Sequence, residues 1–146
     1  MLENIISQNE LTFMIGLAVS IITGFVIGVE RESRGKDAGI STHILVISGS
    51  MTFSFISMVF APDDATRIAA NIVTGIGFLG AGLILKEGTN VRNLTTAASI
   101  WFAGAIGMAI GFGYYAIAII ASIVSIAVPR IPHFDKLTSD TPNNKE

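Results

Sequence analysis

Residues 11–29 read LTFMIGLAVSIITGFVIGV, a run of 19 residues without a charge, and this stretch decides the fold. About 20 apolar residues cross the hydrocarbon core of a bilayer as an α-helix. Other windows without Asp, Glu, Lys or Arg cover 38–62, 68–85 and 93–129. The last window is long enough for two helices, and Gly111-Phe112-Gly113 supplies turn residues near its middle. The sequence therefore predicts spans near residues 11–29, 42–61, 68–85, 94–110 and 114–128, with four spans plus an interfacial helix as the alternative.

Composition agrees with a membrane protein. Hydrophobic residues make up 51% of the 146 and charged residues 14%, whereas soluble domains carry about 25% charge. Cysteine is absent, which excludes disulfide scaffolds, thiolate metal sites and thiol catalysis. The net charge of −2 implies no general attraction to nucleic acid. We therefore expect an all-α integral membrane protein, a compact bundle of about five transmembrane helices with glycine-rich packing.

The basic residues orient these spans, because Lys and Arg near span ends are retained in the cytoplasm. Eight of the nine fall on one side in the five-span arrangement, and one, Arg67, falls on the other. The eight are Arg31, Arg34, Lys36, Lys86, Arg92, Arg130, Lys136 and Lys145. We expect a bacterial inner-membrane protein with an external N-terminal arm (1–10), a transmembrane domain (11–128) and a disordered cytoplasmic tail (129–146).

Small residues recur every fourth position in the first span, at Gly16, Ser20, Gly24 and Gly28. Such a ladder lets two helix backbones approach closely. Two alternatives stay open at this stage: packing against another span of the same chain, or the seam of a homodimer. Further positions predicted to pack helices together lie in the third and fourth spans. They are Gly75, Gly82, Gly104 and Gly111.

A charged string, Glu30-Arg31-Glu32, follows the first apolar run directly. The simplest interpretation is a solvated loop of mixed charge. The functional interpretation is that Glu30 lies at the membrane boundary, where a carboxylate needs a cationic partner. Arg31, Lys86 and Arg92 are the expected partners because all lie on the same predicted side.

Other polar candidates lie at or inside the predicted spans. Thr42 and His43 begin the second span, where capping competes with a functional role. Arg67, Asn71 and Thr74 share one face of the third span, which predicts either interhelical hydrogen bonds or the lining of a translocation path. Residues near the start of the fourth span complete the candidates. They are Arg92, Thr95 and Thr96.

Enzymatic chemistry has no support in the sequence. The predicted spans contain Asp, Glu, Lys, Arg or His only at their ends, so a dehydrating Mg²⁺ site within the membrane is not indicated. The chain has no Walker A loop, HExxH pair or nucleophile elbow. We predict no catalytic residue, no cofactor and no metal site.

Four ordered strings resemble the MgtC/SapB family of bacterial inner-membrane proteins. They are GVERE (28–32), GISTHILV (39–46), IGFLGAG (76–82) and VRNLTTAASIW (91–101). The resemblance implies a helical membrane bundle related to growth in low magnesium and, in some members, to survival inside host cells. It also implies regulation by contact, since a virulence-associated member is thought to restrain the proton-translocating ATP synthase.

Three departures from the family pattern limit what is carried over. Ser41 stands where the family often has Arg, and Asn93 stands where Gly is common. The chain also ends before the cytoplasmic ACT-like domain of longer members. We expect a non-enzymatic factor in adaptation to low magnesium or related stress that acts through contacts in the bilayer, with itself or with a membrane complex such as ATP synthase. The alternative is a small transporter or channel for magnesium or another ion.

Overall fold

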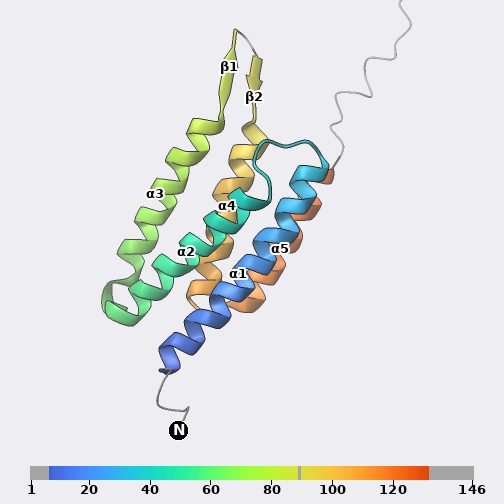
Figure 1. The fold of residues 1–146 in the computed structure, drawn as a ribbon. Helices are drawn as coiled ribbons and strands as arrows, with labels where there is room; N and C mark the ends of the chain where they lie inside the picture. Colours follow the sequence, from blue (N-terminus) through green and yellow to red (C-terminus); the bar gives the residue numbers. More distant parts are fainter. Residues whose placement is uncertain (1–6, 89, 132–146) are drawn as a thin grey trace, which may run out of the picture.

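The computed structural model describes residues 7–88 and 90–131 and confirms a helical membrane protein. Four of its helices are long and apolar enough to cross a bilayer, and a shorter apolar helical segment covers Tyr115–Arg130. The helices run up and down in turn, with α3 at one edge of the bundle and α5 beside α1 and α4 (Figure 1). Their bounds are α1 Gln8–Ser33, α2 Ile40–Phe60, α3 Ala65–Leu83, α4 Leu94–Gly111 and α5 Tyr115–Ala127.

Short elements connect these helices. A 3-10 turn, η1 (Pro62–Asp64), leads into α3, and a second, η2 (Val128–Arg130), continues α5. An antiparallel hairpin joins α3 to α4 through strands β1 (Leu85–Glu87) and β2 (Asn90–Arg92). The hairpin was not predicted from the sequence. Gly88 at its tip has φ +62°, a conformation that suits glycine in a tight turn.

Helix α1 is longer than the predicted first span. It begins at Gln8, where Ser7 and Glu10 form a reciprocal capping box, and it ends at Ser33. The Glu30-Arg31-Glu32 string therefore lies on the last turns of a helix and not in a loop. Hydropathy marks where the apolar run stops, but Glu and Arg are good helix formers and continue the helix beyond it.

A close contact between backbones joins α1 to α2 at two glycines. A Cβ atom placed on Gly24 would lie 2.6 Å from the Cα atom of Ile44, and one placed on Gly28 would lie still closer to the Cα atom of Ile40. Gly16 and Ser20 continue the same buried face. The structure thus places α2 of the same chain against the small-residue ladder.

The glycines of α4 allow close contact with two neighbouring helices, α2 and α3. Gly111 lies against the backbone oxygen of Met51 on α2, and Gly104 lies against the side chain of Ile76 on α3. Gly75 and Gly82 do not pack helices together as predicted, because a Cβ atom on either would meet nothing within 4 Å. Both face outward, since α3 stands at the edge and packs mainly through Ile72, Ile76 and Gly80.

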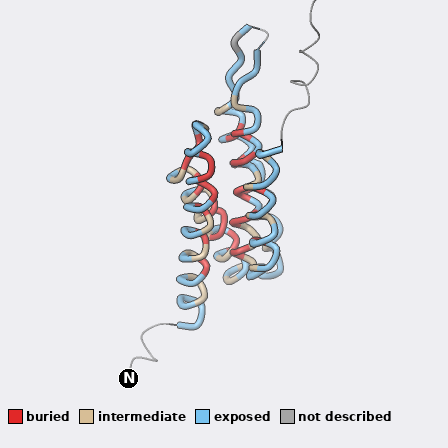
Figure 2. The backbone as a smooth tube through the Cα atoms, turned by 90° about the vertical axis from the view of Figure 1, so that its right-hand side faces the viewer, coloured by how far each residue is buried: buried red, intermediate tan, exposed pale blue. Residues whose placement is uncertain are grey.

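Burial is concentrated along the facing sides of α1, α2 and α4 (Figure 2). One core cluster centres on Ile27, Ile47 and Ile106, and a second joins Ile72 and Ile76 to Ile100. Much of the outer surface carries large exposed apolar side chains, as expected where lipid replaces water. The predicted tail lies outside the described residues from position 132 onward, as do residues 1–6 of the predicted arm.

Replacing Gly28 with Ala should destabilise the bundle by about 1–3 kcal/mol, because the added methyl group would overlap the backbone of Ile40, which cannot rotate away. Gly75→Ala is the matched control, since its Cβ atom meets open space. Thermal unfolding in detergent measures the difference. Equal midpoints for the two variants would contradict the close α1–α2 contact.

Candidate functional site

A group of charged and polar side chains closes one end of the bundle, where α1 ends and α2 and α4 begin. Arg31 and His43 are both 0% exposed, and Glu30 is 6% exposed. Thr96, in the first turn of α4, is also buried. Glu30, Arg31 and His43 are close enough to interact electrostatically. We call Glu30, Arg31 and His43 the polar end cluster.

Helix geometry explains why these residues turn inward. Arg31 lies one turn after Ile27 and continues the buried face of α1. His43 lies one turn before Ile47 on the buried face of α2. The Nδ1 atom of His43 lies 2.9 Å from the carbonyl oxygen of Gly39, which fixes the ring near the start of its helix. The cluster thus forms because two core-facing stripes end in polar residues.

Glu30 links the end of α1 to η2. Its Oε1 atom lies 3.4 Å from Nη1 of Arg34 and 3.4 Å from Nε of Arg130. The expected partners Arg31, Lys86 and Arg92 are therefore not the ones observed in the structure. Adjacent residues on a helix point in different directions, so Arg31 makes no hydrogen bond with Glu30, and the hairpin carries Lys86 and Arg92 beyond α3 and α4 (Figure 1).

Two further acidic residues fasten the same end of the bundle. Glu32 accepts a hydrogen bond from the backbone N–H of Ile40 at 3.0 Å, at the start of α2. Asp37 accepts one from the side-chain amide of Asn93 at 2.5 Å. Asn93 precedes α4 with φ +64° and makes no side-chain cap. Its side chain instead joins the α1–α2 loop to α4.

The remaining candidates lie apart from this cluster. Arg67, Asn71 and Thr74 occupy the exposed side of α3. Asn71 donates to the carbonyl oxygen of Arg67 at 3.1 Å, and Thr74 donates to that of Ala70 at 3.2 Å. These three polar side chains therefore lie on the outside of the bundle and do not line its interior. Three other predicted residues are at least partly exposed near helix starts or on the hairpin. They are Thr42, Thr95 and Arg92.

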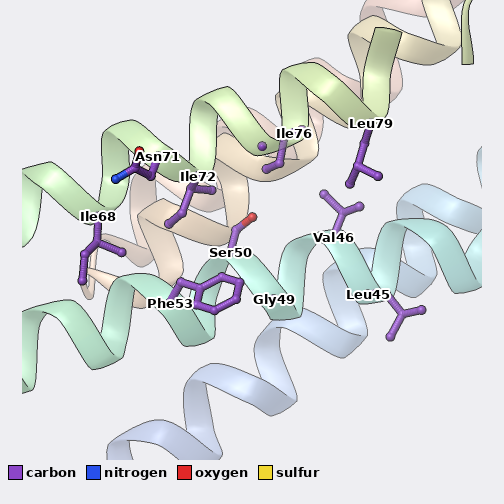
Figure 3. A pocket seen from close by; sticks show the side chains of 11 residues that line it. Leu45, Val46, Gly49, Ser50, Phe53, Ile68, Asn71, Ile72, Ile76 and Leu79 are labelled. Carbon is purple, nitrogen blue, oxygen red and sulfur yellow. The ribbon is translucent and has the colours of Figure 1, made fainter. Parts of the chain in front are cut away.

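A groove of about 510 Å³ runs between α2 and α3 (Figure 3). Most of its lining is apolar, and the side chains of Asn71 and Ser50 contribute polar atoms. Gly49 and Gly75 lie on its two walls, and a Cβ atom added to either glycine would meet no other atom within 4 Å. α2 and α3 therefore leave a depression on the lipid-facing side of the bundle.

Sequence reasoning missed Arg130 as the partner of Glu30 and Asp37 as the partner of Asn93. A signal for Arg130 existed, because it follows the last span on the same predicted side as Glu30. No comparable signal pointed to Asp37, since its contact depends on how the loop after α1 folds back. Among the described residues, no group of three or more His, Cys, Asp or Glu side chains comes together as a metal site.

Glu30→Gln should lower the free energy of unfolding by about 1–2 kcal/mol, because it removes the carboxylate that two partly exposed guanidinium groups share. Faster hydrogen exchange at η2 should accompany the loss, since Arg130 would no longer be tied to α1. Asp63→Asn, an exposed change at the opposite end, should alter neither measurement. Unchanged exchange in Glu30→Gln would show that the Glu30–Arg130 contact does not hold η2.

Comparison with known proteins identifies relatives of this chain. Protein MgtC of Salmonella typhimurium (strain LT2) is 45% identical over 112 residues, which cover 77% of this chain and 48% of the relative. Protein MgtC of Brucella abortus (strain 2308) is 48% identical over 113 residues, covering 77% of this chain and 48% of the relative. YhiD of Escherichia coli (strain K12) is 43% identical over 130 residues, covering 83% of this chain and 60% of the relative.

This chain spans about half the length of the curated MgtC relatives. No solved structure matches it. The model of the MgtC family matches residues 17–133, a range that includes the polar end cluster and all five helices except the start of α1. The chain therefore belongs to the MgtC family.

Proposed function

We propose that this chain is a non-enzymatic membrane factor in adaptation to low magnesium or related stress. Family membership and the relatives named MgtC support the connection to magnesium. The chain acts through contacts between its helices and another membrane protein. The observation that carries this proposal is the outward position of Arg67, Asn71 and Thr74, which a channel lining would turn inward.

The polar side chains on the outward side of α3 favour contact with a helix of another protein over contact with lipid. An Asn side chain has two N–H donors and one acceptor oxygen. One donor of Asn71 is used in a hydrogen bond within its own helix, so the other donor and the oxygen can bind a partner. Polar side chains in a bilayer gain from hydrogen bonds to another helix, and small residues let that helix approach. Gly75 lies open beside Asn71. A second copy of this chain and a larger complex, for which family resemblance suggests ATP synthase, are the candidate partners.

The proposed arrangement is a multi-pass protein of the bacterial plasma membrane with its N-terminus outside. Three connections lie at one end of the bundle, namely the α1–α2 loop, the hairpin and the segment after α5 (Figure 1). They carry Arg34, Lys36, Lys86, Arg92 and Arg130. This concentration of basic residues supports a cytoplasmic position for that end.

Topology can be tested with reporters at both ends. A reporter fused after Glu146 should be cytoplasmic, and a tag before Met1 should be labelled from outside the cell. Labelling of both ends from the same side would contradict five spans. It would favour four spans with α5 lying in the interface.

Asn71→Leu should weaken association with the partner about tenfold, because one interhelical hydrogen bond contributes about 1–2 kcal/mol in a bilayer. Support of growth in low magnesium should fall while the protein accumulates normally. Val73→Leu is the control, since Val73 is exposed on the same helix but two positions away. Full growth support and undiminished crosslinking in Asn71→Leu would remove α3 as the contact surface.

The name given to YhiD proposes magnesium transport for that protein, and transport is the second candidate function here. Magnesium flux into vesicles that contain the purified protein and a magnesium indicator distinguishes transport from the proposed contact role. Our proposal expects no more flux than empty vesicles give. Flux that depends on the protein would overturn it.

A further inference from the structure

Within the described part of the chain, the most deeply buried charge has no hydrogen-bond partner. Arg31 is 0% exposed, and its Nε, Nη1 and Nη2 atoms meet no acceptor among the described residues. The Nε2 atom of His43 is equally buried and equally without a partner. Burying a charged group is costly unless it is paired and hydrogen-bonded. These two side chains therefore point to an acceptor that completes the polar end cluster.

The nearest carboxylate does not fill this role. Oε1 of Glu30 is shared by Arg34 and Arg130, and its Oε2 atom is buried without a partner. One carboxylate thus stands among three guanidinium groups. Arg31, which meets no acceptor among the described residues, is the group that an anion would satisfy.

The other carboxylates of this region are already engaged. Glu32 holds the backbone N–H of Ile40, and Asp37 holds the side chain of Asn93. Neither forms an ion pair with Arg31 among the described residues. Among the residues that the structure describes, no carboxylate is left for Arg31, which favours a bound group as its acceptor.

The hydrogen-bonding pattern selects the kind of anion. A guanidinium donates to two oxygens of one oxyanion at once. The Nδ1 atom of His43 donates to the carbonyl oxygen of Gly39, so the Nε2 atom of the neutral ring is an acceptor. A site with a guanidinium donor and an imidazole acceptor suits an oxyanion that is still protonated, because its O–H group can donate to the imidazole. Inorganic phosphate keeps one near neutral pH, whereas sulfate does not.

We propose that Arg31 and His43 form a binding site for a protonated phosphate group, in which Arg31 donates to two phosphate oxygens and a P–OH group donates to Nε2 of His43. The group comes either from free inorganic phosphate or from the monoester headgroup of phosphatidic acid. This inference does not rest on the proposed function. Because both side chains are closed to solvent, the group can enter only if the hydrogen bonds of Glu32 and Asp37 that hold the loop between α1 and α2 open.

Wild-type protein in a neutral detergent at pH 7.5, freed of phosphate, provides the first test. Its melting temperature is followed against added inorganic phosphate at an ionic strength held constant with sodium chloride. We expect a saturable rise with phosphate and a response to sulfate at least several-fold weaker. The absence of a rise, or equal responses to both anions, would exclude free phosphate as the source. The proposal would then depend on the lipid comparison below.

Arg31→Gln should raise the phosphate concentration at half-saturation by about tenfold to a hundredfold, the usual effect of losing hydrogen bonds to a charged group. Lys36→Gln removes the same charge from the adjacent loop and should leave the response unchanged. Equal responses in wild type and Arg31→Gln would contradict the site. If Arg31→Gln fails to fold, His43→Gln replaces it, with a reduced preference for phosphate over sulfate as the expected result.

Nanodiscs distinguish the two sources. In phosphatidylcholine discs that contain phosphatidic acid, a rise in melting temperature that phosphatidylglycerol does not reproduce assigns the lipid headgroup. A rise with free phosphate in discs of phosphatidylcholine alone assigns the soluble ion. If neither source raises the melting temperature, the proposal fails.

Discussion

The close approach of α1 and α2 at Gly24 and Gly28 is the constraint on which the rest of the structure depends. Two backbones lie nearly in contact there, so the register between the helices allows little slippage. In a bilayer, where apolar side chains gain nothing by leaving lipid for protein, such close packing is a main source of helix association. The positions of the residues at both ends of α1 follow from it.

One result of this register is that Arg31 and His43 lie inside the protein. Each continues a core-facing stripe of its own helix, and the glycine contact fixes the position of one stripe relative to the other. The buried charge is thus produced by the same packing that holds the bundle together. Glu32 and Asp37 reinforce it, since their hydrogen bonds fix the loop that covers the cluster.

Hydropathy was sufficient to predict the helical class, the order of the helices and their approximate bounds, because the apolar windows have the length that a bilayer requires. It could not predict that α1 continues through Glu30, since helix propensity rather than hydropathy decides the last turns. It also could not separate Gly28, which touches a neighbouring backbone, from Gly75, which faces open space. The contacts of Glu30 with Arg130 and of Asp37 with Asn93 depend on tertiary positions that lie far apart in the chain.

The length of α5 has a consequence for the surrounding lipid. Together with η2, α5 forms an apolar helical segment, Tyr115–Arg130, that rises about 25 Å, against about 30 Å for an average hydrocarbon core. For α5 to cross the bilayer, acyl chains beside it must shorten or tilt, and such hydrophobic mismatch costs a fraction of a kcal/mol for each ångström. Membrane thickness would then act on the segment that carries Arg130, and through Arg130 on Glu30. The lipid composition of the membrane, which sets its thickness, would thereby influence the contacts at this end of the bundle.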